Sequence, residues 1–200
     1  MGRHNGRFYL TQQNIEQTDV PRHSVVPQSH FLMMTTPPQL QIRVLFVCMG
    51  NICRSPLAEG IFRNATDEEG VADAFEIDSA GTGSWHVGDP PDRRMHETAV
   101  LHGVSLDGQR ARQFNRRDLE HYDHIFVMDR DNLHDVQYLD TDDQFTHKVR
   151  LFRELDPEPE DYQVPDPYYG GGDGFEIVFK IVDRTARELL ARLIEEHRLS

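Results

Sequence analysis

Eight residues from Cys48 to Ser55 combine side chains that could bind and transfer a phosphate group. Their order is Cys-Met-Gly-Asn-Ile-Cys-Arg-Ser, so a guanidinium and a hydroxyl follow the first thiol by six and seven positions. Gly50 and Asn51 are residue types that tolerate positive φ, and the segment can therefore curl with its N–H groups pointing inward. Such a cradle fits a tetrahedral dianion. It is not a nucleotide-binding loop, because the pattern G-x-x-x-x-G-K-[ST] is absent and the segment has no lysine.

Cys48, Arg54 and Ser55 are candidates for a catalytic set. A thiol at a helix N-terminus near arginine ionises readily, and a thiolate beneath a bound phosphate is an in-line nucleophile. Arg54 offers a planar fork of donors to two phosphate oxygens. Ser55 can donate a hydrogen bond to the sulfur when the thiolate leaves again. A cysteine alone is ordinarily a small buried hydrophobe, but C-x5-R-S between a strand and a helix favours a phosphate site.

Phosphoryl transfer to a thiolate also needs an acid that protonates the leaving group. The acidic segment between residues 156 and 174 supplies several candidates, and residue types alone do not choose among them: Asp156, Glu158, Glu160, Asp161 and Asp166. The plain alternative for Asp166 is an ordinary Asp-Pro turn.

The segments around these residues alternate between strand and helix patterns. Apolar, β-branched runs predict strands at residues 44–47, 75–78, 124–128 and 148–151, and helical spacing predicts helices at 55 to about 64–69, 92–102, 131–139 and 175–197. Strands that alternate with helices indicate an α/β domain with a parallel sheet. Ligands bind at the carboxyl ends of such strands, and Cys48 directly follows the first one.

Composition restricts the class of protein. The 200 residues are 38% hydrophobic and carry a formal net charge of −13, which disfavours non-specific nucleic-acid binding. Residues 1–40 are polar and aperiodic, so we expect a disordered N-terminal extension before one domain at 41–200. The longest apolar run, from Val44 to Met49, is far too short to span a membrane.

Cysteine and histidine usage bears on location and on metals. The chain has 2 cysteines and no apolar segment of a secretory signal near residue 1, so we expect a reducing, cytoplasmic compartment. The 11 histidines show no ligand spacing such as H-E-x-x-H. We therefore expect no metal and no cofactor.

Several segments together resemble the low-molecular-weight protein tyrosine phosphatases. The matching runs, in order over about residues 42–195, are VLFVCMGNICRSPLAEGIFR, IDSAGTGSWHVGDPPD, RARQF, YDHIFVMDRDNL and DPYYGGGDGFE. The resemblance implies a phosphotyrosine phosphatase I-like fold, a three-layer α/β sandwich with a central four-stranded parallel sheet. It also implies a hydrolase that dephosphorylates protein phosphotyrosine through a phosphocysteine, with Cys48 as nucleophile, Arg54 as phosphate clamp and Asp166 as acid and then base.

The resemblance also implies the residues that surround the substrate. The loop would contribute Met49, Gly50, Asn51, Ile52, Cys53 and Ser55, and the mouth of the pocket Met49, Trp85, Tyr168 and Tyr169. Aromatic and thioether walls suit a flat aryl ring and make a slot too deep for phosphoserine to fill. Cys53, as a second loop thiol, could trap an oxidised Cys48 as a reversible disulfide.

Four residues are expected to support the loop from behind. Asn51 can pin the loop, and Ser79 and Asp129 lie at neighbouring strand ends. Gln109 stands where many relatives of that family have histidine. Glutamine can hydrogen-bond but cannot titrate, so any histidine-dependent tuning of the loop is in doubt.

Other activities remain as alternatives. Ile52 stands where relatives that act on phosphoarginine carry threonine, which favours phosphotyrosine and leaves protein phosphoarginine phosphatase as the runner-up. An arsenate reductase relay would need cysteines after Cys53, and the chain has none. A non-catalytic phosphate-binding module would have lost Cys48 or Asp166. The expected partner is a phosphotyrosine-containing protein, such as the tyrosine kinases that bacterial relatives act on, and the sequence does not indicate an oligomeric state.

Overall fold

The computed structural model describes residues 41–168 and 173–199, so the predictions for residues 1–40 and for Tyr169 lie outside the described part. The strands are β1 (Ile42–Cys48), β2 (Phe75–Gly81), β3 (His124–Val127) and β4 (Val149–Leu151). The α-helices are α1 (Arg54–Glu68), α2 (Arg93–Leu101), α3 (Arg116–His121), α4 (Arg130–Tyr138) and α5 (Gly174–His197). Short 3-10 helices are η1 (Ala72–Ala74), η2 (Thr146–Lys148) and η3 (Phe152–Leu155).

The four strands form one parallel sheet in the order β2-β1-β3-β4. The chain leaves β1 for β2 on one side and then returns across β1 to β3 on the other. The carboxyl ends of β1 and β3 therefore flank the point where the strand order reverses, which is where open α/β sheets bind ligands. The predicted four-stranded parallel sheet is confirmed.

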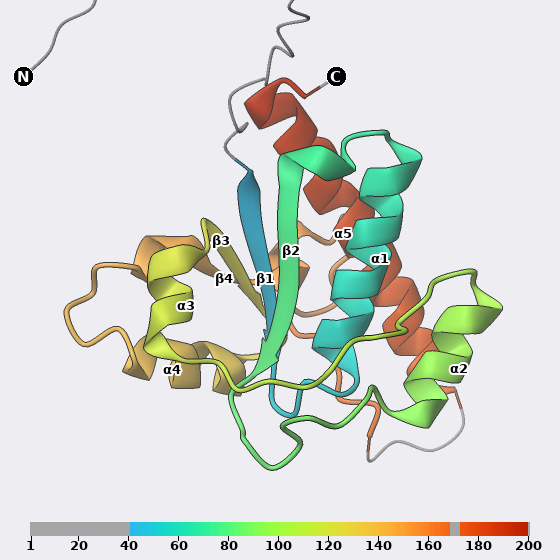
Figure 1. Cartoon of the computed structure of the whole chain (residues 1–200), viewed down its shortest axis with the longest axis horizontal. Helices are drawn as coiled ribbons and strands as arrows, with labels where there is room; N and C mark the ends of the chain where they lie inside the picture. Colours follow the sequence, from blue (N-terminus) through green and yellow to red (C-terminus); the bar gives the residue numbers. More distant parts are fainter. Residues whose placement is uncertain (1–40, 169–172, 200) are drawn as a thin grey trace, which may run out of the picture. The chain divides into compact units, whose positions relative to one another are not determined.

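Helices cover both faces of the sheet (Figure 1), with α1 and α5 on one side and α3 and α4 on the other. The side chains of β1 alternate between the two layers: Val44 and Phe46 join the cluster beneath α1 and α5, and Leu45 and Val47 join the opposite cluster. All four are 0% exposed. A strand buried on both faces needs a continuous apolar run rather than an alternating one, and the predicted three-layer arrangement is confirmed.

The sequence prediction missed helix α3. Its residues include one buried apolar side chain, Leu119, so no helical period of apolar residues reveals it. Its signal is a capping box: Asn115 accepts from the backbone N–H of Arg117, and the Asp118 carboxylate accepts from the backbone N–H of Asn115. An asparagine followed three positions later by an acid marks a helix start even where periodicity is silent.

Candidate active site

The loop between β1 and α1 curls at the carboxyl edge of the sheet. Asn51 has a φ of 54°, as its residue type allows, whereas Gly50 is not among the described residues with positive φ. Gly50 serves another purpose: a Cβ built there would lie 3.1 Å from Cδ2 of His86. The expectation of an inward curl is met at Asn51, and glycine at position 50 leaves space for the neighbouring loop.

The Cys48 sulfur lies at the base of this loop and receives hydrogen bonds. The backbone N–H of Asn51 donates to Sγ at 3.2 Å, and Ser55 Oγ lies 3.1 Å from it. The single hydroxyl proton of Ser55 can go to that sulfur or to the Ala80 carbonyl at 3.2 Å. Donors aimed at the sulfur, together with the N-terminus of α1, suit a thiolate.

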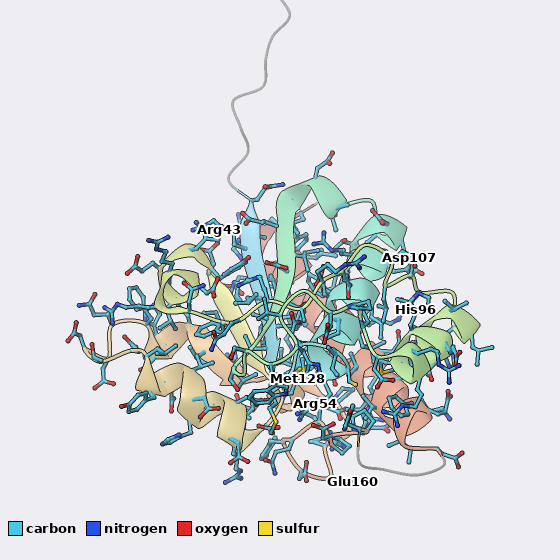
Figure 2. The ribbon with its side chains drawn as sticks, turned by 60° about the horizontal axis from the view of Figure 1, so that its bottom comes forward. Arg43, Arg54, His96, Asp107, Met128 and Glu160 are labelled. Atoms are coloured by element: carbon cyan, nitrogen blue, oxygen red, sulfur yellow. The ribbon has the colours of Figure 1, made fainter. Side chains whose placement is uncertain are left out.

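Arg54 is the first residue of α1 and is 2% exposed. Its guanidinium donates to Asp129 Oδ2 at 2.6 Å, to the Val164 carbonyl at 3.1 Å and to Asp166 Oδ2 at 3.0 Å. Burial alone would lower the pKa of Arg54, but the charges of Cys48, Asp166 and Asp129 raise it above its ordinary value. Figure 2 shows Arg54 near the centre of this end of the molecule and Glu160 at its edge.

Asp129 and Asp166 come from two different segments and meet at Arg54. Asp129 follows β3 and caps α4 by accepting from the backbone N–H of Asn132 at 2.8 Å. Asp166 belongs to the segment between η3 and α5, and its Oδ1 accepts from the backbone N–H of Tyr168 at 3.0 Å. Both carboxylates were predicted from the sequence to lie at the site, and the structure brings both to the same guanidinium.

Asn51 connects the loop to the sheet behind it. Its Nδ2 donates to Ser55 Oγ and to Ser79 Oγ, each at 2.9 Å, and its Oδ1 accepts from the backbone N–H of Arg112. Ser79 in turn donates to Glu59 Oε2 at 2.7 Å. Burial raises the pKa of Glu59, against the opposing effect of its hydrogen bonds from Ser79 and Arg63.

Glu59 is a supporting residue that the sequence prediction did not single out. It is 6% exposed on the packed side of α1, and an acid among apolar positions there was the available signal.

Gln109 also lies behind the loop, where its Nε2 donates to the Pro56 carbonyl at 3.1 Å. Its buried Oε1 has no hydrogen-bond partner among the described residues. Gln109 thus braces the first turn of α1.

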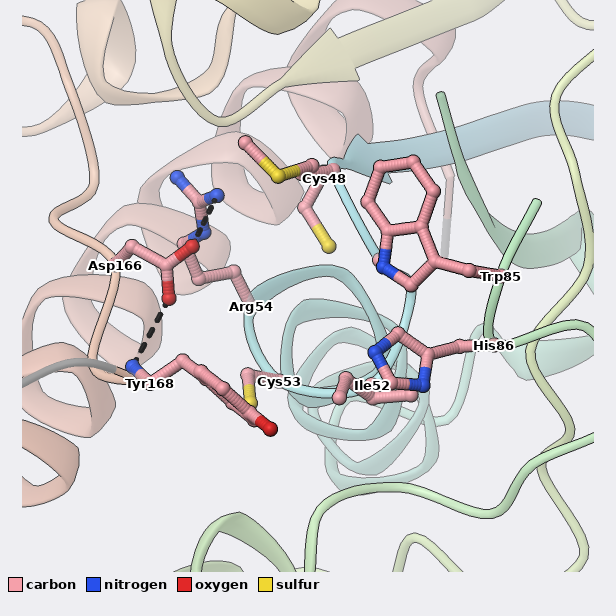
Figure 3. Close-up of a pocket in the computed structure, with 10 residues that line it drawn as sticks. Cys48, Ile52, Cys53, Arg54, Trp85, His86, Asp166 and Tyr168 are labelled. Carbon is pink, nitrogen blue, oxygen red and sulfur yellow. Dashed lines mark hydrogen bonds and ion pairs between the residues drawn. The ribbon is translucent and has the colours of Figure 1, made fainter. Parts of the chain in front are cut away.

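A pocket of about 310 Å³ opens above the loop. Its lining residues are Cys48, Met49, Gly50, Ile52, Cys53, Arg54, Trp85, His86, Asp166 and Tyr168. In Figure 3 the Cys48 sulfur points into the space between Trp85 and His86 on one side and Asp166 and Tyr168 on the other. Of the residues expected to surround the substrate, six line this pocket and Tyr169 lies outside the described part; the six are Met49, Gly50, Ile52, Cys53, Trp85 and Tyr168.

His86 lines the pocket although the sequence prediction passed over it. Its Nδ1 lies 3.0 Å from Asp89 Oδ2, which fixes the ring. The only signal was its position directly after Trp85. Asn51, Ser55, Ser79 and Asp129, in contrast, do not line the pocket and act behind it.

Both cysteines are free thiols that line the same pocket. Burial raises the pKa of Cys53, and the charges of Asp92, Cys48 and Asp166 raise it further. A disulfide between Cys48 and Cys53 stays a prediction.

Among residues 41–168 and 173–199, no group of three or more His, Cys, Asp or Glu side chains could hold a metal ion. Within the same part, no helix is long and apolar enough to cross a membrane.

Comparisons with known proteins point in one direction. Residues 43–199 match the family described as low molecular weight phosphotyrosine protein phosphatase. A low molecular weight protein-tyrosine-phosphatase of Streptomyces coelicolor is 42% identical over 156 residues, covering 77% of this chain and 94% of the relative. The protein of that same description from Bacillus subtilis, YfkJ, is 39% identical over 158 residues, covering 79% of this chain and 99% of the relative.

Solved structures agree. The crystal structure of YfkJ superposes with a TM-score of 0.74 at 38% identity, covering 78% of this chain and 96% of that one. A protein tyrosine phosphatase from Entamoeba histolytica, crystallised with Hepes in the active site, gives a TM-score of 0.74 at 34% identity and covers 80% of this chain and 100% of that one.

Proposed function

The chain belongs to the low molecular weight phosphotyrosine protein phosphatase family, and we propose that it hydrolyses protein phosphotyrosine through a phosphocysteine formed on Cys48. Its relatives are named as protein-tyrosine phosphatases, which makes the reaction class phosphoric monoester hydrolysis. The observation that carries the mechanism is the convergence of a sulfur, a buried guanidinium and a carboxyl on one pocket: Cys48, Arg54 and Asp166. The proposed catalytic domain is residues 41–200.

In the first step the Cys48 thiolate attacks phosphorus in line with the departing phenolate. The S–P bond forms, the P–O bond to the tyrosine ring breaks, and Asp166 transfers its proton to the phenolate oxygen. Arg54 follows the charge on the equatorial oxygens with two N–H donors. In the substrate-free site Arg54 donates to Asp166 Oδ2, so a bound phosphate competes for that donor and frees the carboxyl to act as an acid.

In the second step water hydrolyses the phosphocysteine. Asp166, now a carboxylate, takes a proton from the attacking water, the new P–O bond forms, and the S–P bond breaks to release inorganic phosphate. The sulfur receives the electron pair. The backbone N–H of Asn51 and the hydroxyl of Ser55 are within hydrogen-bond distance to stabilise it as a leaving thiolate.

The pocket walls support an aryl phosphate as substrate. Met49, Trp85 and Tyr168 are 38%, 65% and 41% exposed and stand around the mouth, where a flat ring can contact all three. Ile52 lines the pocket with an apolar side chain, which favours a phenyl ring over the charged guanidinium of phosphoarginine. Tyr169, which follows Tyr168 in the sequence, stays a predicted substrate-binding residue outside the described part.

The macromolecular partner in this proposal is a phosphotyrosine-containing protein, with an autophosphorylated tyrosine kinase as the finer candidate. A cytoplasmic location is part of the proposal, because a reactive thiol beside a second thiol needs a reducing compartment to stay free.

The test is phosphate release from matched peptides that carry phosphotyrosine, phosphoarginine or phosphoserine, with Cys48→Ser as the control. We expect release from phosphotyrosine, with turnover lost and phosphate binding kept in the control. A preference for phosphoarginine would overturn the argument from Ile52. Release from none of the peptides, or undiminished release by the control, would overturn the mechanism.

A further inference from the structure

Arg94, in the first turn of α2, lies between two aromatic rings beside the pocket. Its Cζ is 5.2 Å from the centroid of the Tyr168 ring and 4.6 Å from that of the Phe175 ring. We propose that Arg94 is a positioning residue that holds the Tyr168 ring as the wall of the aryl slot and so sets the affinity for aryl phosphates. The proposal rests on the phosphatase function argued above.

The guanidinium is fixed from below by the N-cap of α2. Asp92 accepts from Arg94 Nε at 3.0 Å through Oδ1 and from a terminal nitrogen at 2.8 Å through Oδ2, which is a two-point contact. The backbone N–H of Asp92 donates to the Ile52 carbonyl at 2.7 Å. Arg94 is therefore tied, through one residue, to the loop that would bind the phosphate.

The other side of the contact is fixed by α5. Phe175, in the first turn of α5, is 8% exposed. At the far end of α2 the ring of His102 stacks on Phe179 at 4.0 Å, and its Nε2 lies 2.9 Å from Glu176 Oε2. These contacts dock α2 on α5 at both ends and keep the backbone of Arg94 beside Phe175 and Tyr168.

Tyr168 is the pocket residue whose ring orientation these contacts would restrict. The residue is 41% exposed. If nothing restricted a half-exposed ring beforehand, substrate binding would have to order it, at a cost in side-chain entropy. A guanidinium over the ring face restricts the ring orientation beforehand. The backbone N–H of Tyr168 also donates to Asp166 Oδ1, so the wall and the proposed acid belong to the same short segment.

The experiment compares Arg94→Leu with Arg94→Lys and Arg94→Gln, and uses Arg93→Leu as the matched control. Arg93 is the adjacent arginine, 83% exposed, whose side chain pairs with Glu97 on the same helix. Each variant is assayed for kcat and KM with an aryl phosphate and a phosphotyrosine peptide. Competitive inhibition by inorganic phosphate is measured alongside, because phosphate binds the loop and Arg54 without reaching the Tyr168 ring.

For Arg94→Leu we expect KM to rise by about two- to fivefold, the size of one exposed cation–π contact. We expect kcat and the inhibition constant for inorganic phosphate to stay within about 1.5-fold of their values in the unsubstituted protein. Arg94→Lys should recover most of the change and Arg94→Gln little of it. In a Tyr168→Leu background, Arg94→Leu should add nothing to KM, because the two residues act through one contact.

Several outcomes would overturn the proposal. The proposal is wrong if Arg94→Leu leaves KM unchanged or if Arg93→Leu raises KM as much. It is also wrong if Arg94→Leu still raises KM in full in the Tyr168→Leu background. A parallel loss of phosphate affinity would show that Arg94 supports the loop instead of the wall. These results require an active protein, whereas absence of turnover in the unsubstituted protein would overturn the proposed function and this inference together.

Discussion

At the scale of single residues, the two oxygens of Asp166 have different partners. Oδ2 accepts from Arg54 and Oδ1 accepts from the backbone N–H of Tyr168. The carboxyl is therefore held beside Arg54, the proposed phosphate clamp, and its side chain is 33% exposed. This placement fits a group that gives a proton in one step and takes one in the next.

Asp166→Asn keeps the shape of the side chain and removes the proton. We expect kcat/KM for an aryl phosphate with a strongly basic phenolate to fall by about 10²- to 10⁴-fold, the usual contribution of general acid–base catalysis. The loss in kcat/KM should be much smaller for nitrophenyl phosphate, because nitrophenolate leaves without a proton. The measurement is kcat/KM for a series of aryl phosphates graded by leaving-group basicity, because kcat also includes the hydrolysis of the phosphocysteine, which Asp166 assists for every substrate.

Glu160→Gln is the control for this series, because Glu160 is an exposed acid in the same segment as Asp166. It should leave the series unchanged. Equal slowing of good and poor leaving groups by Asp166→Asn would argue that Asp166 acts on the loop and does not donate the proton.

Residue types revealed some members of the site and concealed others. Cys48, Arg54 and Ser55 were predictable because their spacing along one loop is itself the signal. The choice of Asp166 needed the family resemblance, because its segment holds several Asp and Glu residues that could each serve as the acid. Glu59 and His86 were missed because their roles depend on long-range packing: Glu59 contacts the site through Ser79 on β2, and His86 comes from the segment after β2.

At the scale of elements, the loop after β1 is closed by the end of β2. The backbone N–H groups of Thr82 and Gly83 donate to the carbonyls of Cys48 and Met49, each at 2.9 Å. Gly81 lies beneath this contact, and a Cβ there would be 2.8 Å from the Met49 carbonyl oxygen and 3.1 Å from the backbone nitrogen of Asn51. Both neighbours are backbone atoms, which cannot turn aside as a side chain does.

Gly81→Ala should therefore displace the phosphate loop. We expect the free energy of unfolding to fall by about 1–3 kcal/mol, the usual result of overpacking, and affinity for inorganic phosphate to fall with it. Urea unfolding and phosphate inhibition provide the two measurements. Gly174→Ala is the control, because a Cβ at the start of α5 has its nearest neighbours at 4.0 Å. If both variants behaved alike, the close approach at Gly81 would not matter.

Sequence periodicity predicted the long elements and failed where an element is short. The apolar stripes of α1 and α5 predicted two helices, and both pack on the same face of the sheet. The continuous apolar run of β1 predicted a strand that is buried on both faces. Helix α3 has six residues and one buried apolar side chain, so its capping box was the only available signal. The strand order was not predictable from pattern, because it depends on which side of β1 each crossover takes.

At the scale of the whole molecule, a buried carboxylate joins three separate parts of the fold. Asp156 is 5% exposed and accepts from Arg153, which follows β4, and from Arg184 on α5. Arg153 also donates to the Gln163 carbonyl at 3.0 Å, in the segment that leads to Asp166. By residue type alone, Asp156 was one of the candidate acids. The structure gives it a different role, since both its oxygens are occupied by arginines.

Burial by itself would raise the pKa of Asp156, but hydrogen bonds from Arg184 and Arg153 lower it to about 2. An unfolded aspartate has a pKa of about 3.9, so the unfolded chain takes up its proton first as the pH falls. The carboxylate therefore stabilises the fold in full above about pH 4, and this contribution is lost progressively as the pH falls towards about 2. A shift of this size corresponds to about 2.6 kcal/mol.

Asp156→Asn should lower the free energy of unfolding by about 3 kcal/mol at pH 7, because it removes the buried carboxylate that pairs with the buried Arg153 and with the half-buried Arg184. The difference from the unsubstituted protein should shrink by about 2 kcal/mol between pH 5 and pH 2.5, since protonation removes the same charge from the unsubstituted protein. Urea unfolding at a series of pH values measures both, with the exposed Asp73→Asn as control. A difference that stayed constant across that range would mean that Asp156 stabilises the fold through packing and not through its charge.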